Sequence, residues 1–255
     1  MKVRAVIFDL DNTLYDYDAA HKIAFDALTR YAVEHLNLSP EEFQAAHREA
    51  MEEQLIRAER ERAAIHNRLI RYQILLENIK KPYYLADKMQ KIYWDVFLRN
   101  MRPAPGVASA LRILKRDYVL GIGTNMTADY QYKKLKYLKL AHFFRFIVSS
   151  EEVQCEKPSL KLFRYCAKKA ECPMSKCAFV GDSFAHDIKG AFKSGMIPVW
   201  YCPDFDLNNN NNNLNHNAPE NASWADTGRP ENIPDGVYLL RRFQDLPALL
   251  ENISK

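Results

Sequence analysis

Residues 3–13 of the chain read VRAVIFDLDNT, an apolar run that ends abruptly in two closely spaced carboxylates. The run is short, and its β-branched and aromatic residues are typical of a strand buried on both faces of a parallel sheet. Asp9 and Asp11 lie just beyond the expected strand end, where the chain can curl so that both approach one site. In open parallel sheets, ligand-binding and catalytic residues lie at the carboxyl ends of the strands. We therefore expect the partners of these carboxylates at other strand ends.

The second half of the chain repeats this kind of strand, and a helical pattern separates each strand from the next. Predicted strands cover residues 118–122, 144–148, 177–180, 197–201 and 237–240, and predicted helices cover residues 107–115, 129–139, 160–169, 185–194 and 243–250. Strands that alternate with helices indicate a parallel sheet with helices on both faces. We therefore predict an α/β fold with a doubly wound, Rossmann-like parallel sheet.

Residues 18–100 have a different character, because they contain no glycine and are rich in Glu, Ala, Arg and Leu. Ser39 followed by Pro40 is a helix start, with serine as the N-cap and proline at the first helical position. Apolar residues then recur at helical spacing, which predicts a module of about four helices. The expected organisation is an α/β core of residues 1–17 and 101–255 with an inserted all-helical domain of residues 18–100.

Residues 204–236 interrupt the α/β pattern with a run of six asparagines, Asn208 to Asn213, and a polar stretch that contains three prolines. Such low-complexity sequence cannot bury enough apolar surface to fold alone. We predict a flexible surface loop within the core, and we assign it no part in the chemistry.

Composition and charge indicate which kinds of binding partner to expect. The chain has 255 residues and a formal net charge of +4, a surplus well short of a nucleic-acid-binding surface. No uncharged apolar run is long enough to span a bilayer. The five cysteines form no CxxC pair and no zinc-ligand spacing, which is typical of reduced thiols. We expect a cytoplasmic monomer or homodimer that binds a small molecule, with neither a nucleic acid nor a membrane as partner.

Further polar residues follow or flank the other predicted strands. They are Thr124 and Asn125 after the strand 118–122, Lys157 at the start of the helix 160–169, and Asp182 after the strand 177–180, with Asp187 five residues later. Because the carboxyl ends of parallel strands share one edge of the sheet, these side chains are expected near Asp9 and Asp11. The set contains carboxylates, a lysine and a hydroxyl group.

Each of these residue types has a role in phosphoryl transfer. One carboxylate can attack phosphorus and form an aspartyl-phosphate, and the other can protonate the leaving oxygen and later deprotonate water. Mg²⁺ prefers oxygen ligands, which Asp9, Asp182 and a backbone carbonyl would supply. Lys157, Thr124 and Asn125 are the candidate phosphate-binding residues, since a positive charge and hydrogen-bond donors stabilise phosphoryl oxygens.

In this order the motifs resemble those of the haloacid dehalogenase superfamily. The DxDxT motif matches at Asp9, Asp11 and Thr13, the hydroxyl motif at Thr124, the lysine motif at Lys157, and the GDxxxxD motif at Gly181, Asp182 and Asp187. The resemblance covers residues 3–201 and the last predicted strand and helix. It implies a Rossmann-like core, and it implies that residues 18–100 form an α-helical cap that closes over the substrate and excludes water.

The resemblance also implies a role for each acidic residue. Asp9 would be the nucleophile, and Asp11 would be the acid/base and would bind Mg²⁺ through its carbonyl. Asp182 would be the third protein ligand of the metal. Asp187 would lie behind these ligands or orient Lys157, which together with Thr124 would complete the catalytic set.

Within the superfamily, Asp11 points to a phosphatase. Haloacid dehalogenases use no metal and lack an aspartate two residues after the nucleophile, because they have no leaving alcohol to protonate. The expected substrate is a small phosphomonoester such as a nucleotide or a sugar phosphate. A phosphomutase, a 2-haloacid dehalogenase and a non-catalytic binding or regulatory module on the same fold remain alternatives.

Residues outside the motifs are assigned more ordinary roles. Tyr15 and Tyr17 directly follow the first motif and are expected to border the site. The run from Lys133 to Lys136 is predicted to be the exposed face of a helix. Five aromatic residues at helical spacing are predicted to be core residues of the inserted domain: Tyr83, Tyr84, Tyr93, Trp94 and Phe97.

Overall fold

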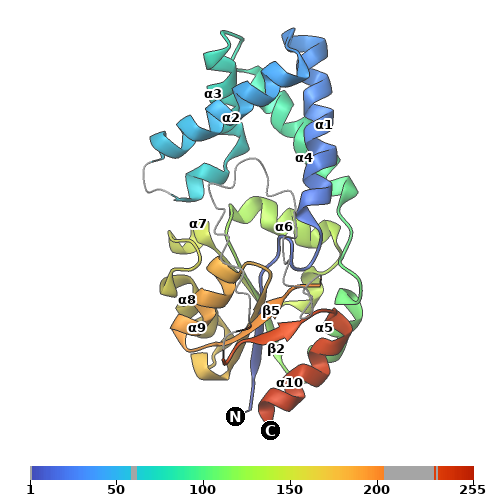
Figure 1. Cartoon of the computed structure of the whole chain (residues 1–255), viewed down its shortest axis with the longest axis vertical. Helices are drawn as coiled ribbons and strands as arrows, with labels where there is room; N and C mark the ends of the chain where they lie inside the picture. Colours follow the sequence, from blue (N-terminus) through green and yellow to red (C-terminus); the bar gives the residue numbers. More distant parts are fainter. Residues whose placement is uncertain (1, 59–61, 204–232, 234) are drawn as a thin grey trace. The chain divides into compact units, whose positions relative to one another are not determined.

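The computed structural model describes residues 2–58, 62–203, 233 and 235–255 (Figure 1). The chain divides into two compact units, one of Met1–Asp16 with Arg102–Lys255 and the other of Tyr17–Met101. We refer to them as the core unit and the helical unit. The predicted loop of residues 204–236 lies, apart from residues 233, 235 and 236, outside the described residues.

Among the described residues, a six-stranded sheet with the strand order β3-β2-β1-β4-β5-β6 forms the centre of the core unit. The strands are β1 (Ala5–Phe8), β2 (Val119–Thr124), β3 (Phe146–Ser149), β4 (Cys177–Gly181), β5 (Ile197–Tyr201) and β6 (Tyr238–Leu240). Every neighbouring pair in the sheet is parallel. The prediction of a doubly wound parallel sheet is confirmed.

The strand order reverses at β1, which pairs with β2 on one side and β4 on the other. Asp9 directly follows β1, and its main-chain N–H donates to the carbonyl of Val180 at 2.8 Å. A reversal of this kind leaves a crevice at the carboxyl ends of the strands, where ligands of open α/β sheets bind. The topology therefore puts Asp9 at the most favourable point of the sheet for binding and chemistry.

Helices cover both faces of the sheet. Figure 1 shows α8 and α9 on one side and α5 and α10 on the other. The helical segments of the core unit are α5 (Val107–Leu114), α6 (Ala128–Tyr137), η2 (Ala141–Phe143), α7 (Ser150–Val153), α8 (Leu160–Ala170), η3 (Met174–Lys176), η4 (Phe184–Ile188), α9 (Lys189–Ser194), η5 (Phe243–Asp245) and α10 (Leu246–Ser254). Phe163 of α8 packs edge-on against Phe179 of β4, with 4.9 Å between ring centroids. Such apolar contacts between helix and strand bury both faces of the sheet.

Two of the differences between the predicted and observed element boundaries lie beside the site. The strand predicted over residues 118–122 continues to Thr124, because Gly123 and Thr124 still pair with β3. The helix predicted over residues 185–194 is not continuous. It begins with η4, a π-helical turn, and becomes α-helical only in α9.

The described part of the helical unit contains α1 (Tyr17–Leu36), α2 (Pro40–Arg57), η1 (Arg62–His66), α3 (Arg68–Asn78) and α4 (Leu85–Asn100). The predicted start at Ser39 is confirmed, since Ser39 and Glu42 form a reciprocal capping box. The long helical pattern is split before Asn67, whose side chain caps α3. In the part of the chain that the structure describes, no helix has the length and apolar character needed to cross a membrane.

The predicted aromatic core of the helical unit is only partly right. Tyr93, Trp94 and Phe97 of α4 are buried, and their ring centroids lie 5.2–5.6 Å apart. Tyr83 and Tyr84 are each 67% exposed, so the prediction is wrong for these two. They precede the first residue of α4, and the helical spacing that predicted burial does not apply to the turn before the helix.

Candidate active site

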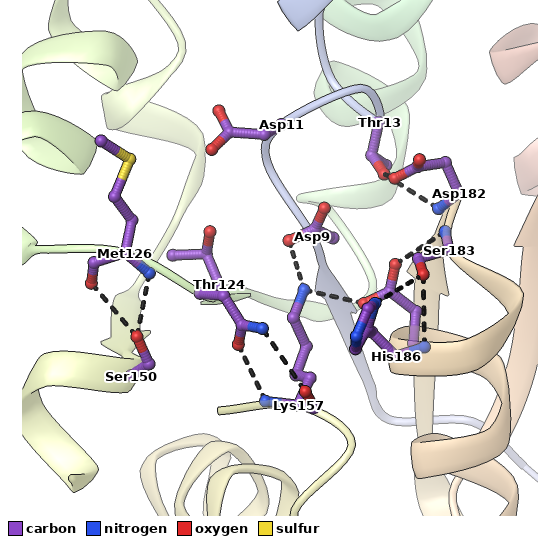
Figure 2. Close-up of polar contacts among 12 residues, drawn as sticks. Asp9, Asp11, Thr13, Thr124, Met126, Ser150, Lys157, Asp182, Ser183 and His186 are labelled. Atoms are coloured by element: carbon purple, nitrogen blue, oxygen red, sulfur yellow. Dashed lines mark hydrogen bonds and ion pairs between the residues drawn. The ribbon is translucent and has the colours of Figure 1, made fainter. Parts of the chain in front are cut away.

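The Asp9 carboxylate lies in a buried charge cluster at the carboxyl ends of β1 and β4 (Figure 2). The ammonium group of Lys157 forms one ion pair with Asp9 Oδ1 and a second with Asp187 Oδ1 at 2.7 Å. Carboxylate oxygens of Asp9, Asp182 and Asp187 all lie within 4.8 Å of one another. Four residues from three separate motifs therefore meet in one place.

The cluster carries more negative than positive charge, with three carboxylates around the single ammonium of Lys157. Burial raises the pKa of Asp9 to about 7; Lys157 opposes this rise, whereas Asp187 adds to it. Burial, followed by the carboxylates of Asp187 and Asp9, also holds the pKa of Asp182 well above its usual range. A cation bound among these oxygens would relieve the repulsion.

The GDxxxxD motif has a steric basis in the structure. A Cβ atom on Gly181 would lie only 2.3 Å from Asp187 Oδ2, so a glycine is needed for this carboxylate to approach the strand end. The same carboxylate oxygen accepts a hydrogen bond from the main-chain N–H of Ser183 at 3.0 Å. The π-helical turn η4 carries Asp187 back toward β4, which explains the five-residue spacing from Asp182.

Thr13 is a site residue for which the sequence predicted no role of its own. Its side chain is completely buried, and its hydroxyl donates to Asp182 Oδ1 at 2.9 Å and accepts from the main-chain N–H of Asp182 at 3.1 Å. The indole N–H of Trp200 also donates to the Asp182 carbonyl at 2.9 Å. Thr13 thus orients the Asp182 carboxylate, and the threonine of the DxDxT motif was the available signal.

The Asp11 side chain points away from the Asp9 cluster and has its own set of partners (Figure 2). The ammonium of Lys134 lies 2.7 and 2.8 Å from the two carboxylate oxygens. The Tyr15 hydroxyl donates to Oδ1, and the Gln131 amide donates to Oδ2 at 3.3 Å. Burial alone would raise the pKa of Asp11, but the charge of Lys134 and these hydrogen bonds together lower it. Asp11 is therefore held as a carboxylate.

Lys134 corrects the prediction that residues 133–136 form an exposed face. Its side chain is completely buried, whereas Lys133 is exposed and pairs with Asp129 at 2.8 Å. Gln131, Lys134 and Leu135 are the buried residues of α6, and they share one face at spacings of three and four. That spacing is compatible with burial of Lys134, but a buried lysine needs a carboxylate partner, and the helix sequence does not show one.

Thr124 and Asn125 hold different parts of the site together. The Thr124 hydroxyl is buried and accepts from the Gln131 amide at 2.6 Å, which leaves its own hydrogen available for another acceptor. The Asn125 side chain accepts from the Lys157 main-chain N–H at 2.8 Å and donates to the Lys157 carbonyl at 3.4 Å. Asn125 thus fixes the backbone that carries Lys157, a contact different from the phosphate binding expected of it. Tyr15 borders the site as expected, whereas Tyr17 belongs to the helical unit.

The sequence matches a known family over most of its length. The family model for haloacid dehalogenase-like hydrolases covers residues 6–200. The chain belongs to this family. The predicted resemblance is therefore confirmed.

Curated and solved relatives of this haloacid dehalogenase-like hydrolase agree with the assignment. A glyceraldehyde 3-phosphate phosphatase from Methanothermobacter thermautotrophicus is 33% identical over 199 residues, which cover 77% of this chain and 84% of the relative. A ribulose-1,5-bisphosphate 5-phosphatase from Halopiger xanaduensis is 32% identical over 210 residues, covering 78% of this chain and 84% of the relative. The magnesium-bound structure of the HAD-hydrolase YfnB from Bacillus subtilis has the same fold, with a TM-score of 0.68 at 23% identity and coverage of 98% and 100%.

Proposed function

We propose that the chain is a Mg²⁺-dependent phosphatase that hydrolyses a small phosphomonoester through an aspartyl-phosphate on Asp9. The observation that carries this proposal is the buried Asp9 carboxylate, which lies beside two further carboxylates and the Lys157 ammonium. Asp11, two residues away, is available as a separate acid/base. The relatives named as sugar-phosphate phosphatases support this class of substrate.

The donor set fits Mg²⁺, which prefers carboxylate and carbonyl oxygens. Asp9 and Asp182 would hold the ion together with the Asp11 carbonyl, and Asp187 would remain paired with Lys157. The surplus negative charge of the cluster supports a divalent cation, as does the magnesium bound by YfnB. When bound, the ion would offset the repulsion between the anionic nucleophile and the anionic phosphate.

In the first step an Asp9 oxygen attacks phosphorus, and the bond from phosphorus to the leaving oxygen breaks. The leaving oxygen takes a proton from Asp11, while Lys157 and the Thr124 hydroxyl stabilise the phosphoryl oxygens. In the second step a water oxygen attacks phosphorus and gives its proton to Asp11. The bond between Asp9 and phosphorus breaks, and inorganic phosphate and the free Asp9 carboxylate are released.

Lys134 acts in this scheme as a positioning residue for Asp11. Its ion pair keeps Asp11 as a carboxylate, the form that accepts a proton from water in the second step. For the first step, Asp11 must take up a proton and leave Lys134. The Gln131 amide donates both to Asp11 and to Thr124, so it links the acid/base to a phosphate-binding hydroxyl.

We expect Lys134→Met to lower kcat roughly tenfold or more, since a displaced acid/base loses part of its contribution of about 10²- to 10⁴-fold. Removing the ammonium raises the pKa of Asp11, which must be protonated in the first step, so the basic limb of the pH profile of kcat/KM should move to higher pH. Lys133→Met, which removes an exposed charge from the same helix, is the control. A variant with an unchanged kcat and an unchanged pH profile would show that Lys134 has no part in positioning Asp11.

The test of the proposed function is phosphate release from a panel of sugar phosphates and nucleotides, with added Mg²⁺ and with EDTA. We expect release from at least some of them with Mg²⁺, and its loss with EDTA. If folded, Mg²⁺-loaded protein releases no phosphate, the proposal fails. Isomerisation primed by a bisphosphate would then indicate a phosphomutase. Release of halide without metal would indicate a dehalogenase. If the protein catalyses neither reaction, it is a non-catalytic binding module.

A further inference from the structure

Gln131 of α6 is a completely buried glutamine of the core unit that contacts both Asp11 and Thr124. Its amide nitrogen donates to the Thr124 hydroxyl at 2.6 Å and to Asp11 Oδ2 at 3.3 Å. Its amide oxygen is buried too and has no hydrogen-bond partner among the described residues. A buried polar atom without a partner is costly, so a stronger interaction must hold the amide in this orientation.

The Asp11 carboxylate supplies that interaction. The two ends of a glutamine amide have nearly the same shape, so the surrounding hydrogen bonds decide which end faces which neighbour. Asp11 is paired with the Lys134 ammonium at 2.7 Å, and as a carboxylate it only accepts hydrogen bonds. It would repel an amide oxygen at 3.3 Å, whereas the NH₂ group donates to it. The NH₂ end of Gln131 therefore faces Asp11 and Thr124. The same holds once Asp11 has given its proton to the leaving oxygen.

This orientation determines how the Thr124 hydroxyl can be used. A hydroxyl group has one hydrogen to donate and lone pairs that accept. The NH₂ group of Gln131 occupies the acceptor side of the Thr124 oxygen, so the hydroxyl hydrogen must point elsewhere. The hydroxyl donates to none of the described residues, and Figure 2 shows it directed to the side on which the Asp9 and Asp11 side chains lie. Its hydrogen is thus available to a ligand at the carboxyl ends of the strands.

We propose that Gln131 is a positioning residue for phosphate binding, because its NH₂ group occupies the Thr124 oxygen and so directs the hydroxyl hydrogen to a phosphoryl oxygen. A donor that already points at the developing negative charge need not reorient during the reaction, which makes its hydrogen bond more effective. Thr124 is only 1% exposed, so few water molecules compete for this hydrogen. The inference rests on the proposed phosphatase function and deepens it.

The test is a double-substitution cycle that measures inhibition by orthovanadate, whose oxygens take the places of the phosphoryl oxygens. The inhibition constant is measured with saturating Mg²⁺ and with an aryl phosphate as substrate, whose leaving group departs without a proton from Asp11. In the otherwise wild-type protein, Thr124→Val should raise this constant about tenfold or more, because a hydrogen bond to a charged oxygen is lost.

Gln131→Glu is the second substitution of the cycle. It keeps the shape of the side chain but leaves the atom beside Asp11 and Thr124 with at most one hydrogen, where the amide has two. The Asp11 carboxylate takes that hydrogen if it is present, so the Thr124 hydroxyl donates to the glutamate oxygen and no longer to phosphate. We expect Thr124→Val to change the constant by less than about twofold in the Gln131→Glu background. The effect of an added charge is present with and without the Thr124 hydroxyl, so it cancels in this comparison.

Gln131→Met tests the same role even if Gln131→Glu does not fold, since methionine has a similar length and adds no charge. The Thr124 hydroxyl then loses the contact that directs it, so the inhibition constant should rise about threefold or more. In the Thr124→Val background, the same substitution should change the constant by less than about twofold. Gln73→Glu is the matched control, because Gln73 is an exposed glutamine that donates to Glu77 at 2.9 Å, and it should leave the constant unchanged.

The outcomes distinguish the role of Gln131 from the phosphatase activity. If the wild-type protein hydrolyses the aryl phosphate but Thr124→Val raises the constant by the same factor whatever residue stands at position 131, Gln131 does not direct the hydroxyl. The phosphatase proposal then stands. An unchanged constant in Thr124→Val alone would also overturn the role of Gln131. If the wild-type protein with Mg²⁺ hydrolyses no phosphomonoester, the phosphatase proposal fails, and the positioning role of Gln131 fails with it.

Discussion

Replacing Asp9 with asparagine is expected to reduce phosphate release about a thousandfold or more. The side-chain amide has nearly the same shape as the carboxylate but is a far weaker nucleophile, so no aspartyl-phosphate forms. Removing the nucleophile of a covalent mechanism has among the largest effects of any single substitution. Phosphate release from the best substrate of the panel, measured with saturating Mg²⁺, gives the size of the loss.

The Asp9→Asn protein should keep its fold. Lys157 retains its ion pair with Asp187 at 2.7 Å, and the burial that raises the pKa of Asp9 means that the charged form is not strongly favoured in the folded state. Circular dichroism and the melting temperature check this expectation. Asp129→Asn, on the exposed face of α6, is a matched control that should retain activity.

A direct search for the intermediate completes this experiment. Rapid quenching in acid should trap a phosphate on the peptide that contains Asp9 in the wild-type protein, and no phosphate should be found there in Asp9→Asn. Near-wild-type turnover by Asp9→Asn, or a trapped phosphate on another residue, would contradict the assignment of Asp9 as nucleophile.

The residues that the structure gathers around Asp9 could be predicted from the sequence because they follow from sheet geometry. Lys157, Asp182 and Asp187 are far from Asp9 in the chain. Asp182 directly follows β4, Asp187 lies in the turn after it, and Lys157 lies in the connection that leads from β3 to α8. Parallel pairing of β1 with β4 brings Asp9 close to Asp182 and Asp187. Short apolar runs followed by polar residues can be recognised in the sequence alone. The order of the motifs then indicates which polar residues share the edge of the sheet.

The surroundings of Asp11 could not be predicted in this way. Lys134 lies 123 positions from Asp11, in a lysine-rich helix whose local pattern favours exposure. Its burial depends on a carboxylate that only the tertiary fold supplies, because a lysine is buried at low cost only when it is paired. Charge patterns in a single helix do not contain that information.

The helical unit illustrates the same limit. Apolar spacing predicted its helices, but it did not predict which charged residues face inward. Arg68 and Arg71 lie three positions apart on α3, so they share one face of the helix, and arginine is mostly an exposed residue in proteins. Their burial follows from hydroxyl and amide groups contributed by other helices, such as Tyr17 of α1 and Gln54 of α2.

Replacing Asp11 with asparagine is expected to slow both the formation and the hydrolysis of the aspartyl-phosphate, by about 10²- to 10⁴-fold for a substrate with a poor leaving group. An aryl phosphate separates the two steps, because its leaving group departs without a proton. With that substrate, Asp11→Asn should release one equivalent of phenol in a fast burst and then turn over slowly. Stopped-flow absorbance measures both phases.

Asp11→Asn should also destabilise the fold, because it removes the carboxylate that pairs with the completely buried Lys134 ammonium. Breaking such a pair costs roughly 2–3 kcal/mol, less than for a pair in which both groups are fully buried. The double variant Asp11→Asn with Lys134→Met removes both charges, so its free energy of unfolding should recover while its activity stays low. That combination separates the chemistry of Asp11 from its structural role. If activity recovers together with stability, or if Asp11→Asn forms and hydrolyses the intermediate at wild-type rates, Asp11 is not the acid/base.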